Sequence, residues 1–360
     1  MRSFRLERQL DLDPRRAALC RVAGALCALV LSALVLAFTG RNPAWILWQA
    51  LDAIFSQQRG IEGVLLRAIP ILMTALAVAL SLRMRIWNIG SDGQFLVGAF
   101  AAVGVGINLN APGWLVLLAM AAASTLAGAA WILIPALARA YWGVNEIITT
   151  LLSGFIAVQL CAWAALGFWR DEGAWAIQST EAIKDTLPKI PGTESLTIAL
   201  LFPLVIAGAL WWVFRSTRAG YEIDMIGGNP KAAAFAGINV PRRVVAVMLV
   251  TGAIAGLGGM IHLAGSPGAQ QLNSGFSAQY GLSGFIVAAI AGGSFLGLVV
   301  GGFLIAGMFF SGLVLQTRGL SVYIVLALYG IILIGVAVGE MAARYRLVRA
   351  ESEVVARRST

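Results

Sequence analysis

Apolar residues fill most of the chain in long runs that short polar segments interrupt. A hydrocarbon core about 30 Å thick needs roughly 20 mainly apolar residues per helix. By that measure the pattern predicts an all-α polytopic membrane protein with about ten transmembrane helices. The predicted spans are 19–39, 63–82, 94–109, 113–138, 145–168, 195–214, 244–264, 282–296, 298–315 and 320–338. The eighth and ninth runs flank Gly292 and Gly293, and they could instead form a re-entrant pair.

Composition supports the same class. The chain is 59% hydrophobic and 12% charged, whereas soluble domains carry about 25% charged residues. The longest predicted outside loop, 169–194, is too short for a catalytic domain, although it could cap the outer mouth or touch a partner. Gly252, Gly256 and Gly259 share one helical face, and such faces let helix backbones approach closely in lipid.

Basic residues predict the orientation. If the N-terminus lies inside and every span crosses, the inside segments hold 19 of the 26 Lys and Arg residues, as the positive-inside rule requires. We therefore expect a multi-pass protein of the bacterial inner membrane, with cytoplasmic tails 1–18 and 339–360 around a transmembrane domain 19–338. Membrane topology and anionic lipid headgroups account for the net charge of +9 without any nucleic acid.

One predicted cytoplasmic segment, 215–243, differs from the rest of the chain. It combines five basic residues with two acidic ones, a turn signal at Asn229-Pro230 and a short Ala-rich helical pattern. A polar helix at the membrane surface suits a soluble partner that pushes on the membrane helices. The candidate contact residues are Glu222, Asp224, Gly227, Asn229, Ala232, Ala233 and Gly237.

Two polar breaks open predicted spans and are candidates for a substrate pathway. The first, 88–94, suggests a turn into a helix N-terminus, where free N–H groups meet polar substrate atoms; a simple helix start is equally compatible. The second, 145–153, places polar residues on one helical face at four-residue spacing. That face could line a path, but bonding between neighbouring helices is favoured. The candidates are Asn88, Ser91, Asp92, Gln94, Asn145, Glu146, Thr149 and Ser153.

Several kinds of chemistry are missing from the sequence. No GxxxxGKS or GxxxxGKT sequence occurs, so we predict a transport subunit without its own ATPase motif. The three cysteines lie in or beside apolar spans and His262 is the sole histidine, so no metal site, disulfide or cofactor is predicted. No carboxylate falls in the centre of a predicted span, which disfavours proton coupling. An ion-coupled secondary transporter or a channel remains the alternative.

Four motifs occur in the order that a known family shows. NIGSDGQ at 88–94, followed by VGA at 97–99, resembles the signature of permeases in the branched-chain amino acid, simple-sugar and nucleoside group of ABC importers. The stretch 220–238 resembles the ATPase-coupling segment of that family. GVNEIITT and GFSAQYGLSGFIVAAIAG are similar to the nucleoside-type branch. The resemblance covers most of residues 60–338.

The resemblance implies a permease subunit that moves a small polar solute across the inner membrane. A nucleoside or purine-like solute is favoured, and a simple sugar comes next. It further implies three partners: an ABC ATPase subunit, a second permease chain giving a heterodimer, and an extracytoplasmic substrate-binding lipoprotein. The chain departs from the family pattern at Glu222 and Asp224, where basic residues are usual, and near Ser153, where the nucleoside-type branch tends to carry an Asn.

Overall fold

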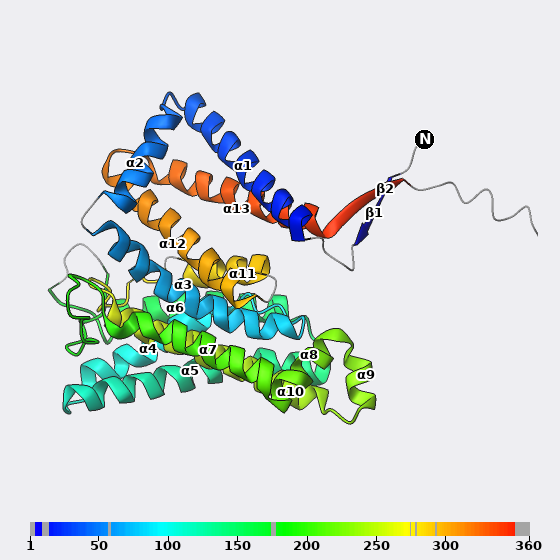
Figure 1. Ribbon diagram of the computed structural model, residues 1–360. Coiled ribbons are helices and arrows are strands. Elements are labelled where there is room, and N and C mark those ends of the chain that lie inside the picture. The colour runs from blue at the N-terminus through cyan, green and yellow to red at the C-terminus, as the bar shows by residue number, and fades with distance from the viewer. Residues whose placement is uncertain are drawn as a thin grey trace, which may run out of the picture. The chain divides into compact units, whose positions relative to one another are not determined.

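The computed structural model describes residues 4–8, 14–56, 59–173, 178–273, 275–277, 279–291 and 294–349. They form two compact units. One is built from both ends of the chain, Met1–Leu51 with Gly312–Thr360, and the other is Asp52–Ser311. Figure 1 labels the helices and strands of both units.

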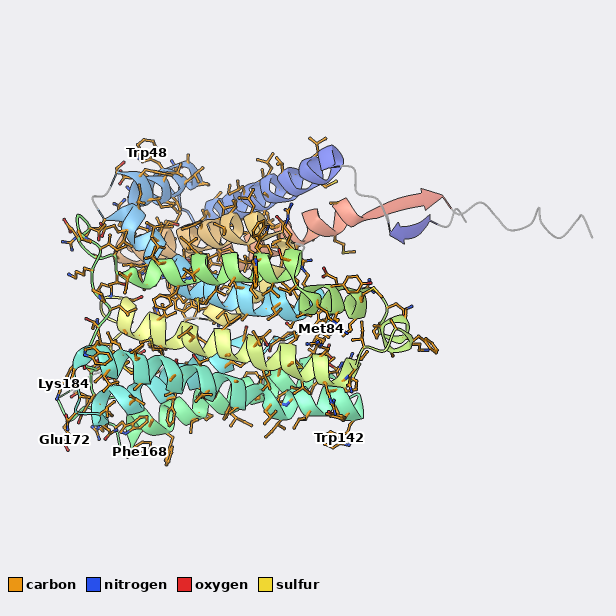
Figure 2. All side chains as sticks on the ribbon, turned by 60° about the horizontal axis from the view of Figure 1, so that its bottom comes forward. Trp48, Met84, Trp142, Phe168, Glu172 and Lys184 are labelled. Atoms are coloured by element: carbon orange, nitrogen blue, oxygen red, sulfur yellow. The ribbon has the colours of Figure 1, made fainter. Side chains whose placement is uncertain are left out.

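The larger unit is entirely helical apart from its connecting segments. Its elements are α3 (Gly60–Arg83), α4 (Ser91–Asn108), α5 (Gly113–Trp142), α6 (Glu146–Leu166), the 3-10 turn η1 (Ile198–Leu200), α7 (Leu201–Ser216), α8 (Arg218–Gly228), α9 (Pro230–Phe235), α10 (Val240–Gly265), α11 (Tyr280–Ala291) and most of α12 (Phe295–Thr317). The two ends of the unit are visible in Figure 2, where Phe168, Glu172 and Lys184 lie at one end and Met84 and Trp142 at the other.

Helix α10 packs against α3, α4 and α5 and forms the centre of this unit. Its glycine face meets the backbones of its neighbours. A Cβ atom at Gly256 would lie 2.9 Å from Gly128 Cα on α5, and one at Gly259 would lie 2.8 Å from Ala99 N on α4. Side chains at these positions would therefore push the helices apart, so the glycine face predicted from the sequence is a helix-packing face.

Seven helices within the described residues are long and apolar enough to cross a membrane. They are Gly60–Arg83, Gly113–Trp142, Glu146–Leu166, Ile198–Ser216, Val240–Gly265, Phe295–Thr317 and Val322–Ala343. An eighth span results if Val22–Phe38 and Pro43–Phe55, which meet at 117°, count as one. A helix lies over each of the ten predicted runs, but the count of ten is not confirmed. Helix α11 has 12 residues, about 18 Å of helix, which is too short to span.

The smaller unit is a pair of long helices joined to a two-stranded ribbon. It holds β1 (Phe4–Arg8), α1 (Pro14–Phe38), most of α2 (Pro43–Phe55), the end of α12, α13 (Val322–Arg344) and β2 (Tyr345–Arg349). Helices α1 and α13 pack at a close glycine crossing, where a Cβ at Gly24 would lie 2.7 Å from Gly339 Cα. Strands β1 and β2 pair antiparallel, from Phe4↔Arg349 to Arg8↔Tyr345. The expected all-α fold is thus confirmed for the membrane helices, and the ribbon is an addition that the sequence pattern did not predict.

The predicted outside loop packs across the end of α10 in the larger unit. Thr180 N donates to Leu272 O at 2.9 Å, Ile183 N to Gln270 O at 3.0 Å, and Leu187 N to Ala264 O at 2.8 Å. These backbone bonds join the segment before α7 to the segment that follows α10, so the two connections form one layer.

Candidate functional site

The first polar break lies inside the larger unit. The chain leaves α3 at Arg83, turns through Arg85, which has a φ of 57°, and enters α4 at Ser91. The side chains of Asn88 and Gln94 are fully buried. They bond each other reciprocally: Asn88 Nδ2 donates to Gln94 Oε1 at 3.0 Å, and Gln94 Nε2 donates to Asn88 Oδ1 at 2.9 Å. Both amides are therefore engaged with each other.

Asp92 connects the beginning of α4 to the beginning of α11. Its two carboxylate oxygens accept from Ser277 Oγ at 2.8 and 2.7 Å, and Oδ1 also accepts from Gly281 N at 2.8 Å. Ser91 Oγ donates to Gly281 O at 3.1 Å. A carboxylate at a helix N-terminus is favourable because the free N–H groups there carry partial positive charge. Asp92, which the sequence places at the start of a predicted span, therefore caps the N-terminus of α11.

Helix α11 is also held from the side of α3. Thr74 Oγ1 donates to Tyr280 O at 3.0 Å. The Tyr280 ring belongs to an aromatic cluster in which its centroid lies 5.1 Å from the ring of His262, while Phe276 lies 5.1 Å from the same imidazole. His262 Nδ1 is 3.0 Å from Ser266 Oγ, so the sole histidine is a buried, hydrogen-bonded member of the packing around α11.

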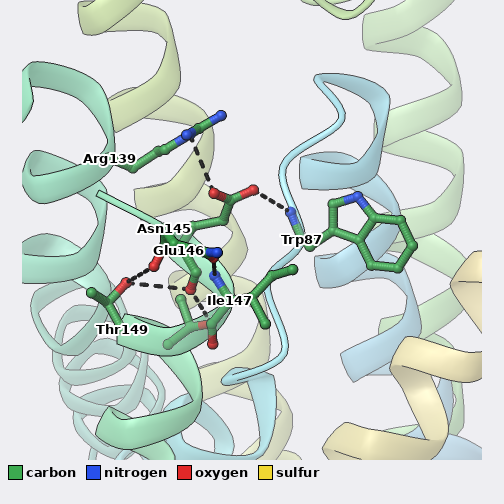
Figure 3. A network of polar contacts seen from close by, with 7 residues as sticks. Trp87, Arg139, Asn145, Glu146, Ile147 and Thr149 are labelled. Carbon is green, nitrogen blue, oxygen red and sulfur yellow. Dashed lines mark hydrogen bonds and ion pairs between the residues drawn. The ribbon is translucent and has the colours of Figure 1, made fainter. Parts of the chain in front are cut away.

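The second polar break is organised around Glu146, which Figure 3 shows between Arg139 and Trp87. The Glu146 side chain is buried. Its Oε1 accepts from Trp87 N at 3.3 Å, and its Oε2 lies 3.3 Å from Arg139 Nε. The neighbouring Asn145 caps α6, because its Oδ1 accepts from Ile147 N at 2.9 Å. Glu146 thus ties α5, α6 and the segment leading to α4 together.

The polar face of α6 bonds mainly to its own backbone. Thr149 Oγ1 donates to the Asn145 and Glu146 carbonyls at 3.3 Å each, and Ser153 Oγ donates to Thr150 O at 2.7 Å. The bond to a neighbouring helix uses the Ser153 carbonyl, which accepts from Trp131 Nε1 on α5 at 3.2 Å. These hydroxyls therefore do not make the interhelix bonds that the sequence favoured, and a role in a pathway stays a prediction.

The predicted contact segment forms two short helices between α7 and α10. Thr217 caps α8 by accepting from Gly220 N at 3.2 Å. Asn229 caps α9 by accepting from the Lys231 and Ala232 N–H groups at 3.0 and 3.3 Å. Gly237 has a φ of +82°, a left-handed conformation that glycine adopts at no steric cost. The turn signals in the sequence thus correspond to helix ends.

Glu222 faces inward from α8. It accepts from Arg218 Nε at 2.9 Å and forms an ion pair with Arg243 of α10. Burial alone would raise the pKa of this carboxyl, but the hydrogen bonds from Arg243 and Arg218 outweigh burial and hold the pKa below its ordinary value. The negative charge is therefore paired within the chain, by Arg218 of α8 and Arg243 of α10.

The end of α8 packs against the C-terminal end of α3. A Cβ at Gly227 would lie 3.5 Å from Met84 Cα and would run into the Arg83 carbonyl. Asp224 Oδ1 lies 3.3 Å from Arg83 Nη1, and the Arg83 guanidinium stacks over the Phe214 ring at 4.6 Å. The segment therefore contacts α3 at Arg83 and α10 through Glu222.

Helix α9 presents one large side chain that the sequence analysis did not select. Ala233 is fully buried, whereas Phe235, two residues later, is 94% exposed. Ala232 and Gly237 are exposed as well. The available signal for Phe235 was a large aromatic residue at the end of the short Ala-rich pattern of α9. Ser277 and Gly281 were also missed, because their role depends on Asp92, far away in the sequence.

Comparison with known proteins identifies the family of this chain. Residues 60–337 match the model of the family described as the branched-chain amino acid transport system permease component. The chain belongs to this family. It is a permease subunit of an ABC transporter and a multi-pass protein of the inner membrane, as its sequence motifs implied. ABC permeases work with an ATPase and a substrate-binding protein.

Three relatives show the range of the family. The chain is 31% identical to a glucose ABC transporter permease protein of Haloferax volcanii, over 94% of this chain and 93% of the relative. It is 28% identical to a guanosine ABC transporter permease protein of Bacillus subtilis, over 79% and 80%. It is 26% identical to a nucleoside ABC transporter permease protein of Lactococcus lactis subsp. cremoris, over 80% of each. No solved structure matches the chain.

Proposed function

We propose that this permease imports a nucleoside or purine-like solute, driven by a separate ATPase that docks on α8 and α9. Family membership carries the transport function, and the motifs at 143–150 and 275–292 support the nucleoside-type branch. Two of the relatives are permeases for guanosine and for nucleosides. The chain itself would hydrolyse no ATP. It would pair with a second, different permease chain and receive its solute from a lipoprotein.

The contacts of α8 and α9 support the coupling role. A displacement of α9 would pass through α8 to two membrane helices. One connection runs from Asp224 and Gly227 to Arg83 at the end of α3. The other runs from Glu222 to Arg243 in the first turns of α10. Because α3 leads into the Asn88 segment and α10 packs on α4 and α5, both connections reach the packed centre of the larger unit.

Phe235 would be the anchor of the ATPase contact. A short helix in a groove binds mainly through apolar side chains on one face, and aromatic residues dominate such interfaces. The inward orientation of Glu222 means that this carboxylate would act by holding α8, not by touching the ATPase. The small exposed residues Ala232 and Gly237 would let a groove of the ATPase close around the Phe235 ring.

Cellular uptake of radiolabelled guanosine tests this coupling. Phe235→Ala should reduce ATPase co-purification and uptake at least tenfold, since truncation of an aromatic anchor costs about 2 kcal/mol or more. Gly237→Val should impair uptake with normal membrane insertion, because a β-branched residue is strained at positive φ. Trp142→Ala is the matched control, since Trp142 is an exposed aromatic residue at the end of α5, outside α8 and α9. Normal uptake by both the Phe235 and Gly237 variants would refute the docking role.

A simple sugar is the second candidate solute. The glucose permease relative aligns with nearly the whole chain, so the identity of the solute needs a direct measurement. Titration of the transporter's substrate-binding protein with guanosine and with glucose would distinguish the two. Binding of glucose alone would replace the nucleoside assignment and leave the coupling proposal intact.

The orientation is part of the same proposal. Docking of the ATPase requires α8 and α9 on the cytoplasmic side, and the distribution of basic residues supports a cytoplasmic location for both chain ends. A reporter enzyme fused after residue 360 and active only in the cytoplasm should be active. Activity of a periplasm-specific reporter at that position would contradict the predicted topology.

A further inference from the structure

Helix α6 carries an exposed amide deep within its length. Gln159 lies 13 residues after Glu146 and seven before Leu166, the two ends of α6, which is about 20 Å and about 10 Å along the helix axis. The residue is exposed, and no hydrogen bond joins its side chain to the described residues. A glutamine is too short to bring its amide to the headgroups over 10 Å, and hydrocarbon offers no hydrogen-bonding groups. The amide therefore needs a partner at this depth.

Lipid alone does not explain an amide at this position. On the other six spans of the described chain, exposed charged or amide side chains lie within a turn of a helix end, as Arg215 does on α7 and Arg242 on α10. Helix α7 is as uncovered as α6, with 17% of its span buried against 22%. Between Ile198 and Phe214 it nevertheless carries apolar residues only. A surface that contacts lipid needs no amide, so Gln159 indicates a different neighbour for α6.

Gln159 belongs to a row of side chains that faces away from α4 and α5. The buried face of α6 includes Thr150, Ala157 and Cys161, which lie on the opposite side of the helix from Gln159. The row follows steps of four and three residues: Ile148, Leu152, Phe155, Gln159, Ala162 and Leu166. Its four large apolar members are between 51% and 61% exposed. This repeat is the one by which two helices pack along their length at about 20°, and one polar residue within such a seam fixes the register.

We propose that this row is the seam on which α6 packs against a helix of the second permease chain, with the Gln159 amide hydrogen-bonded to a polar side chain of that helix. The inference rests on the proposed pairing of two permease chains. Related chains pair about a two-fold axis, so the same face of each chain meets the other. The expected neighbour is therefore the counterpart of α6, running parallel to it, with side chains at equal depth in contact.

The composition of the row favours a helix over a solute as its neighbour. A path for a polar solute needs several polar groups along its wall, whereas the row contains one amide among large apolar side chains. Side-chain amides and hydroxyls that bond across helices are a recurrent means of association within membranes. A single amide in an apolar seam thus fits a helix pair.

Photo-crosslinking within the complete transporter tests which molecule covers the row. The photoreactive residue p-benzoylphenylalanine is placed at Phe155, one turn from Gln159 and 61% exposed. Irradiation should join it to the second permease chain, and peptide mass spectrometry should locate the adduct on the counterpart of α6. The same residue placed at Val205 of α7, which is 67% exposed, is the control and should form lipid adducts only.

The other adducts separate this inference from the proposed function. Adducts at Phe155 with lipid alone, or with α1 or α13 of the same chain, would overturn the seam; if the second permease chain still co-purifies, the proposed function stands. An adduct with another copy of this chain would support the seam and refute the pairing of two different chains. Absence of any second permease chain from the complex would overturn both.

A substitution of Gln159 tests the hydrogen bond itself. Gln159→Leu removes the amide, and dissociation of fluorescently labelled permease chains in rising detergent should become about 3- to 30-fold easier. Asn108→Leu is the matched control, because it removes an exposed amide at the end of α4 and should leave dissociation unchanged. Unchanged dissociation of Gln159→Leu would overturn the proposal, and a loss of uptake beside it would show that the amide faces the solute instead.

Discussion

Replacement of Gly256 by alanine tests whether backbone contact between α10 and α5 stabilises the larger unit. The added methyl group would meet the Ser124 carbonyl oxygen and would lie 2.9 Å from Gly128 Cα. Carbon atoms are best separated by about 3.5–4.0 Å, so the helices must separate by at least about 0.6 Å. The matched control is Gly208→Ala on α7, where a Cβ would have no neighbour within 4 Å.

The two substitutions should change stability in opposite directions or by clearly different amounts. Alanine is favoured over glycine within a helix by about 1 kcal/mol, and this gain is common to both positions. Overpacking costs about 1–3 kcal/mol and applies to Gly256 alone. The difference between the variants should therefore be about 1–3 kcal/mol, a ratio of roughly 5- to 150-fold in the unfolding equilibrium.

Unfolding in mixed micelles of a mild detergent and sodium dodecyl sulfate, followed by circular dichroism, measures this difference. Comparison of the two variants at equal detergent composition removes the shared gain in helix propensity. Equal midpoints for Gly256→Ala and Gly208→Ala would show that α5 and α10 do not rely on close backbone approach, and the packing argument would fail.

Three further substitutions address single contacts. Asp92→Asn should lower the melting temperature through a loss of about 1–3 kcal/mol, since the bonds from Ser277 and Gly281 lose their charged acceptor; an unchanged melting temperature would contradict the helix-cap role. The lowered pKa of Glu222 means that its contribution to stability is present above its ordinary pKa of about 4.3 and disappears as the pH falls through the depressed value. Melting of the parent should therefore approach that of Glu222→Gln at acidic pH, and a constant gap between them would oppose this. Trp131→Phe should lower the free energy of unfolding by about 1 kcal/mol in the same micelle assay. An unchanged free energy would mean that the hydrogen bond from Trp131 to α6 does not stabilise the protein.

The hydrophobic pattern predicted where the helices lie, but it did not predict which of them are long enough to cross a membrane. A run of about 20 apolar residues defines a spanning helix because backbone groups must be satisfied within lipid. The run at 282–296 is shorter, and periodicity alone cannot distinguish a short span from a helix that ends inside the protein. The structure shows 12 residues of helix in α11, with its beginning fixed by Asp92. That fixation depends on tertiary contacts that no local pattern records.

The polar breaks were found from sequence, but their partners were not. Asp92 and Glu146 stand out in an apolar chain, and both are central to the contacts described. Ser277, which donates to Asp92, lies 185 residues away, so only the fold brings the two together. Glu222 was selected as a partner contact, and its pairing with Arg218 and Arg243 could not be predicted from the sequence. Nothing in the local pattern distinguishes an outward carboxylate from an inward one.

The β1–β2 ribbon makes the chain nearly circular. Phe4, where β1 begins, is paired with Arg349, where β2 ends, so these two residues lie side by side. Proteins whose ends lie close together generally tolerate new ends elsewhere. A short linker from Arg349 to Phe4 would join α13 to α1 in one continuous hairpin, and fresh ends could then be opened in the turn after Phe38. Such a rearranged gene would keep α1, α13 and their pairing, and it would close the ribbon end of the smaller unit into a loop.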